Sequence, residues 1–132
     1  MSKLTLMSFI LTMLIAVQAN AQIDADELYD LVEHHYADNG GVSIHYVSLG
    51  EGPLLIFIHG FPNQWYDWRH QMAALADDYK VVAISLRGYN RSDKPRGVEN
   101  YELPHLTGDV LAVMDDVDVQ SATIVGHDWG GI

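Results

Sequence analysis

Two hydrophobic patterns alternate along most of this chain. Short runs of β-branched and other apolar residues predict buried strands at 54–58, 80–86 and 122–125. Between them, apolar residues recur at three- and four-residue intervals in 65–75 and 106–117, and this spacing predicts helices with one apolar face. Strands that alternate with helices in this way are typical of an α/β sheet whose strands run mostly parallel.

A β-hairpin is predicted ahead of this alternation. The segments 31–37 and 42–49 have strand character and flank Asn39-Gly40-Gly41, whose residues tolerate the positive φ of a tight turn. Apolar and polar residues alternate along 42–49, so we expect an edge strand with one face on the core. The predicted domain therefore begins with a hairpin and continues as alternating strands and helices.

The first residues have the pattern of a secretory signal peptide. Lys3 gives a positive start, residues 4–17 are mostly apolar, and Ala19-Asn20-Ala21 is a small-x-small cleavage site. A membrane anchor is the alternative, but the apolar stretch is shorter than the roughly 20 residues that a spanning helix needs. We expect cleavage after Ala21, no stable membrane insertion, and a secreted or periplasmic protein whose domain spans residues 22–132.

Composition and charge exclude several classes of function. A formal net charge of −11 argues against a nucleic-acid partner, and a hydrophobic content of 48% argues for a folded core. The absence of cysteine from the sequence excludes disulfides, thiolate metal sites and a cysteine nucleophile. Asp115, Asp116 and Asp118 crowd one helix end without other ligands at metal spacing, so we expect them in solvent. We predict no metal and no cofactor, and the oligomeric state stays open.

The chemistry is predicted to lie where the strand 122–125 runs into Gly126-His127-Asp128-Trp129-Gly130-Gly131. Gly126 and Gly130 stand two positions on either side of Asp128, which is the spacing of a nucleophile elbow between a strand and a helix. An aspartate with an unperturbed pKa of about 3.9 is ionised at neutral pH and can attack carbon directly. The alternative is that Asp128 only caps the following helix.

A second loop at the same edge of the sheet is predicted to complete the site. The strand 54–58 ends in His59-Gly60-Phe61-Pro62, where Gly60 allows a sharp turn and Pro62 stiffens the loop. The backbone N–H of Phe61 is then available to stabilise an oxyanion, together with the N–H of Trp129. His59 is a candidate base, but a histidine within such a turn more often hydrogen-bonds the backbone, so we predict a structural role.

The helix predicted at 65–75 contributes one further candidate. Trp65 and Trp68 begin its apolar repeat, so we expect both to face the core. A weaker alternative places Trp65 at a substrate pocket near Phe61.

The two loops together resemble those of the α/β-hydrolase superfamily, and specifically its epoxide-hydrolase branch. The resemblance extends over residues 35–132 and includes the loop 87–95, although Ser85 stands where that family more often has aspartate. It implies that Asp128 opens an epoxide of a small-molecule substrate through an alkyl-enzyme ester. It also implies that the N–H groups of Phe61 and Trp129 hold the oxyanion formed when water attacks the ester.

The resemblance further implies that an acid, a histidine base and the tyrosines of a cap domain lie beyond Ile132. We therefore expect residues 22–132 to form the amino-terminal half of an α/β-hydrolase core, truncated after the elbow, with an exposed apolar edge and little or no turnover. A haloalkane dehalogenase is the alternative enzyme, disfavoured because those enzymes commonly have asparagine or glutamate where Phe61 stands. A non-catalytic hydrolase-like protein and a gene fragment without function are the remaining alternatives.

Overall fold

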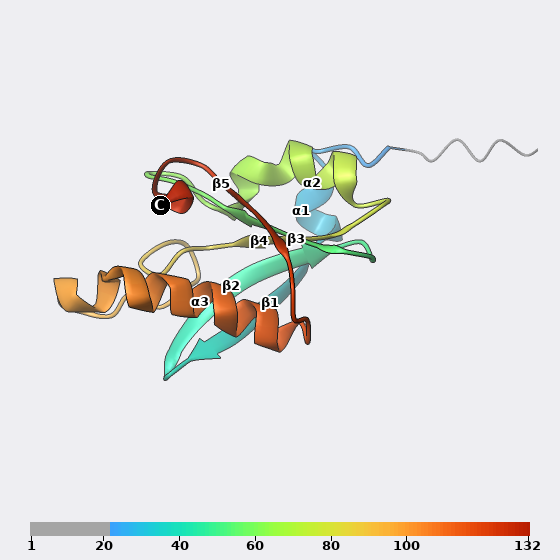
Figure 1. Cartoon of the computed structure of the whole chain (residues 1–132). Coiled ribbons are helices and arrows are strands. Elements are labelled where there is room, and N and C mark those ends of the chain that lie inside the picture. The colour runs from blue at the N-terminus through green and yellow to red at the C-terminus, as the bar shows by residue number, and fades with distance from the viewer. Residues whose placement is uncertain (1–21) are drawn as a thin grey trace, which may run out of the picture.

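The computed structural model describes residues 22–132 (Figure 1). The predicted signal peptide, residues 1–21, lies outside this range and stays a prediction. Within the range, no helix is long and apolar enough to cross a membrane.

One mixed sheet of five strands forms the centre of the molecule, in the order β1-β2-β4-β3-β5. Its strands are β1 (Glu33–Asn39), β2 (Val42–Leu49), β3 (Leu54–Ile58), β4 (Lys80–Ile84) and β5 (Thr123–Gly126). β3 pairs in parallel with both β4 and β5, whereas β2 pairs antiparallel with β1 and β4. The predicted fold class, an α/β sheet that opens with a hairpin, is confirmed.

Helices cover both faces of the sheet. They are α1 (Leu28–Leu31), η1 (Trp65–Trp68), α2 (Arg69–Leu75), η2 (Val98–Tyr101), α3 (Leu103–Asp116) and η3 (Asp128–Gly131). Figure 1 shows α1 and α2 on one face and α3 on the other. Successive residues of a strand point to opposite faces, so Leu55 and Phe57 pack with Met72 of α2, while Ile56 packs with Val113 of α3.

The second strand of the hairpin is not at the edge of the sheet, and the expectation of an edge strand at 42–49 is wrong. β1 forms the edge, and β2 lies between β1 and β4 with hydrogen-bonded neighbours on both sides. The alternating polar positions of β2 therefore face a second covered surface, and His45 is fully buried there. Its Nδ1 lies 2.9 Å from Ser85 Oγ, and its Nε2 lies 2.9 Å from His34 Nδ1.

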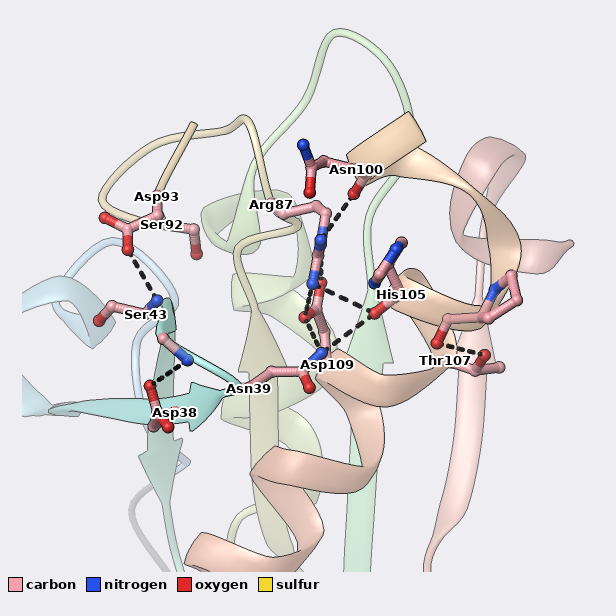
Figure 2. Close-up of polar contacts among 12 residues, drawn as sticks. Asp38, Asn39, Ser43, Arg87, Ser92, Asp93, Asn100, His105, Thr107 and Asp109 are labelled. Atoms are coloured by element: carbon pink, nitrogen blue, oxygen red, sulfur yellow. Dashed lines mark hydrogen bonds and ion pairs between the residues drawn. The ribbon is translucent and has the colours of Figure 1, made fainter. Parts of the chain in front are cut away.

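The loop after β4 is fixed by a buried ion pair that the sequence did not predict (Figure 2). Arg87 donates from Nε and a terminal nitrogen to the two carboxylate oxygens of Asp109 on α3, at 2.7 and 2.6 Å, and both side chains are buried. Asn39 at the end of β1 donates to the same carboxylate at 2.8 Å. A side chain on Gly108 would crowd this asparagine, because an added Cβ would lie 2.8 Å from its Nδ2. The contacts join β1, α3 and the loop 87–95.

The aspartates at and just beyond the end of α3, Asp115, Asp116 and Asp118, are exposed, as expected. Asp116 accepts a 2.6 Å hydrogen bond from the hydroxyl of Tyr46 on β2. Burial and this carboxylate raise the pKa of Tyr46 above its usual value. This hydrogen bond joins the helix end to the sheet, although both Asp115 and Asp116 are exposed.

Candidate active site

Asp128 occupies a strained turn directly after β5. Its φ of 56° lies in the left-handed region, where residues other than glycine are uncommon. The side chain is exposed, and the 3-10 turn of η3 begins at this residue. A non-glycine residue held in this conformation at the carboxyl end of a strand is the backbone geometry of a nucleophile elbow.

Three glycines allow the close approach of backbone segments around this turn. A Cβ on Gly126 would collide with the carbonyl oxygen of Gly130, and a Cβ on Gly130 would collide with that of Ile58. A Cβ on Gly60 would collide with the side chain of Asp128. The spacing of the glycines in the sequence therefore has a steric reason at each position.

The loop after β3 contacts Asp128 through its backbone. The N–H of Phe61 donates a 2.9 Å hydrogen bond to Asp128 Oδ1. The N–H groups of Phe61 and Trp129 lower the pKa of Asp128 below its usual value, and the nearby His127 adds to the shift. The carboxylate is therefore ionised at neutral pH, with the N–H of Phe61 directed at it. Pro62 follows Phe61 through a cis peptide bond.

His59 is buried between the ends of β3 and β4 and bonds main-chain groups with both ring nitrogens. Its Nδ1 lies 2.9 Å from the carbonyl oxygen of Gly60, and its Nε2 accepts a 3.1 Å hydrogen bond from the N–H of Leu86. Burial lowers the pKa of the imidazole. Both nitrogens are engaged by backbone, so His59 holds the loop and is not available as a base for Asp128.

Trp65 lies in the core and not at the site. It is 1% exposed, and its ring stacks on Tyr29 with centroids 5.7 Å apart. The weaker expectation that it lines a substrate pocket near Phe61 is therefore wrong, because its indole fills the space between α1, η1 and the sheet.

An apolar hollow of about 670 Å³ lies beside the elbow, on the α3 face of the sheet. Its wall includes Leu86, Val110, Met114, Ile124 and Trp129. Ile124 on the edge strand β5 and Trp129 are 46% and 61% exposed, so the expected exposed apolar edge is present. Among residues 22–132, no group of three histidine, aspartate or glutamate residues is arranged to hold a metal ion.

Comparisons with known proteins agree with this geometry. Residues 53–132 match the model of the alpha/beta hydrolase fold family. The chain is 50% identical to "Epoxide hydrolase 1" of Caenorhabditis elegans over 93 residues, which are 69% of this chain and 23% of that protein. It is 46% identical to "Epoxide hydrolase B" of Mycobacterium tuberculosis over 102 residues, 74% of this chain and 29% of that protein.

A solved structure is similar over the same region. The crystal structure of an epoxide hydrolase from Vigna radiata superposes with a TM-score of 0.73 at 41% identity, and the match covers 76% of this chain and 33% of that one. The chain thus spans between about a quarter and a third of the length of these relatives.

Proposed function

Because this chain belongs to the alpha/beta hydrolase fold family, we propose that Asp128 is a nucleophile that opens an epoxide ring to form an alkyl-enzyme ester. The observation that carries the proposal is the 2.9 Å hydrogen bond from the N–H of Phe61 to Asp128 Oδ1 at the strained turn. The similarity to three epoxide hydrolases supports an epoxide as the substrate class.

The hydrogen bond gives the two carboxylate oxygens different roles. Oδ1 is held by the backbone donor, so Oδ2 is the oxygen that attacks the ring carbon. A new C–O bond forms, the ring C–O bond breaks, and the resulting alkoxide takes up a proton from solvent water. When water then attacks the ester carbon, negative charge develops on Oδ1, where the Phe61 and Trp129 N–H groups stabilise it. The released diol carries the former Oδ2.

The test is to trap the ester on the 132-residue chain. After incubation with styrene oxide, we expect peptide mapping by mass spectrometry to find one substrate molecule added at Asp128. Asp128→Ala removes this adduct, whereas Asp118→Ala retains it. Asp118 is the matched control, because it is an exposed aspartate with a similar φ of 59°.

Two results would contradict the proposal. Adducts spread equally over exposed carboxylates would mean that Asp128 has no special reactivity. Bromide release from a bromoalkane, without any adduct from styrene oxide, would favour a haloalkane dehalogenase instead. In a form that completes turnover, a single turnover in labelled water should give a diol with unlabelled oxygen from Asp128.

The signal-peptide pattern carries a separate proposal on location. We propose that the protein is exported, and that cleavage after Ala21 leaves Gln22 as the first residue. Amino-terminal sequencing of the exported protein tests this directly, and an intact Met1 on it would contradict the proposal.

A further inference from the structure

We infer that His59 is a positioning residue that directs the Phe61 N–H at Asp128, and that it does so as the neutral Nδ1–H tautomer. This inference rests on the proposed role of Asp128 and adds a determinant of its charge and orientation. His59 does not contact the reacting atoms in this arrangement. It acts through one peptide group, the one between Gly60 and Phe61.

The orientation of that peptide follows from its carbonyl. The Gly60 oxygen accepts two hydrogen bonds, one from His59 Nδ1 at 2.9 Å and one from the N–H of Asn63 at 3.0 Å. The Gly60–Phe61 peptide is trans and planar, so its N–H points opposite to its C=O. Donors that fix the carbonyl on one side therefore fix the N–H on the other, 2.9 Å from Asp128 Oδ1.

The other ring nitrogen fixes the tautomer. The N–H of Leu86, just after β4, is only a donor, so His59 Nε2 accepts with its lone pair. The proton of the neutral ring is then on Nδ1, where it is donated to the Gly60 oxygen. The ring of Tyr89 packs edge-on against the imidazole, with centroids 5.1 Å apart. His59 thus bridges the ends of two neighbouring strands and is 1% exposed.

The groups around the ring favour this neutral form on balance. Burial has the largest effect and lowers the pKa of His59, whereas the hydrogen bond to Gly60 and the charge of Asp67 on η1 raise it. His127 lines a small hollow together with His59 and Asp67, and Tyr89 faces the ring from the loop after β4. Protonation would place a second N–H donor against the N–H of Leu86, where no acceptor exists for it.

The first measurement is nitrogen NMR of the histidine rings in the full 132-residue chain at neutral pH. We expect His59 to have a protonated Nδ1 and an unprotonated Nε2. A proton on Nε2, or an imidazolium, overturns the inference.

The second measurement uses the signal of the Asp128 carboxyl carbon to find the pH midpoint at which Asp128 is protonated, in three variants. His59→Phe removes both ring contacts, and we expect the midpoint of Asp128 to rise by about half a pH unit or more, because the N–H loses its fixed direction. His59→Asn keeps a donor near the Nδ1 position, so its midpoint should lie between those of His59→Phe and the native chain. His45→Gln is the control, since His45 is equally buried but lies away from the elbow, and it should leave the midpoint unchanged.

These outcomes separate the inference from the proposed function. An unchanged Asp128 midpoint in folded His59→Phe overturns the positioning role, even if the styrene oxide adduct forms. A raised midpoint supports it, even if no adduct is found. If His59→Phe does not fold, the tautomer of the native chain is the deciding test, and a proton on Nε2 overturns the inference.

Discussion

Asp109 and Asp128 lie in two regions of the molecule that use the same side chain in opposite ways. Asp109 is fully buried on α3, and both of its oxygens accept hydrogen bonds from Arg87. Asp128 is exposed after β5, and Oδ1 accepts a hydrogen bond from the backbone of Phe61. The first carboxylate stands on a regular helix, whereas the second requires a left-handed backbone.

The difference shows what separates a structural carboxylate from the proposed nucleophile. Asp109 is neutralised by a full opposite charge and has no access to solvent, so it joins elements and has no oxygen free for chemistry. Asp128 is stabilised by peptide dipoles without a cationic side chain bonded to it, and it stays accessible. Four experiments test this contrast.

The largest effect is expected from Asp109→Ala. It leaves the Arg87 guanidinium buried without its partner, and breaking such a pair typically costs about 3–5 kcal/mol. Urea denaturation measures the free energy of unfolding. The double variant Arg87→Met, Asp109→Leu should lose less than Asp109→Ala, because no charge remains buried. A loss below about 1 kcal/mol for Asp109→Ala would mean that the ion pair does not stabilise this region.

The second effect is a pH dependence of the free energy of unfolding that comes mainly from His45 in the hairpin. Burial, with smaller contributions from His34 and Arg91, lowers the pKa of His45 from 6.5 to about 4. Between these values the unfolded chain binds a proton that the folded chain does not. The free energy of unfolding should therefore fall as the pH drops from about 6.5 to about 4, by up to about 3 kcal/mol.

Denaturation of the native chain and His45→Gln across this pH range checks the prediction, and the slope should be smaller in the variant, where His59 still contributes to it. The hydrogen bond from Phe61 to Asp128 should weaken only at lower pH. The pKa of Asp128 is lowered from 3.8, and its carboxylate stays charged at any pH above that lowered pKa. An equal slope in both proteins would assign the acid sensitivity to other groups.

The third effect comes from Gly130→Ala compared with Gly131→Ala. A Cβ on Gly130 collides with the backbone of Ile58, and overpacking of this kind costs about 1–3 kcal/mol. On Gly131 the nearest atom is the Gly126 oxygen at 3.8 Å, so the change should stay within about 0.5 kcal/mol. Only Gly130→Ala should also abolish the styrene oxide adduct. Equal losses of stability would exclude the steric account of the elbow.

The smallest effect has the opposite sign. Asp128→Gly should increase the free energy of unfolding by up to about 1 kcal/mol, because glycine adopts a φ of 56° without strain. Thermal denaturation is the measurement, and Asp118→Gly should behave similarly at a φ of 59°. A loss of stability for Asp128→Gly alone would mean that this carboxylate contributes to the fold as Asp109 does.

The parts of the fold that were predictable depend on local signals. Apolar runs and helical spacing were sufficient to predict the alternating strands and helices. The glycines around Asp128 were sufficient to predict a turn at the end of β5. The Arg87–Asp109 pair gave no such signal, because Asp109 occupies an ordinary polar position of a helix and its partner is 22 residues away. Its burial depends on how α3 docks.

The two wrong predictions, an edge strand at 42–49 and Trp65 at a substrate pocket, have the same physical origin. Alternation along β2 is compatible with an edge strand or with an interior strand covered on both faces, and the pairing with β4 decides between them. Trp65 begins a helical repeat near the loop of Phe61, yet its large ring is accommodated only by the core. In each case a partner distant in sequence determines the environment.

In the proposed mechanism, the fixed carbonyl of Gly60 also affects the activation barrier. In water, dipoles must reorient as negative charge moves onto an oxygen, and this reorganisation raises the barrier. Here the Gly60–Phe61 peptide is already oriented toward Asp128 Oδ1 by hydrogen bonds on its opposite side. The free-energy cost of aligning that dipole is met once, during folding, so the barrier to the proposed ester hydrolysis need not include it.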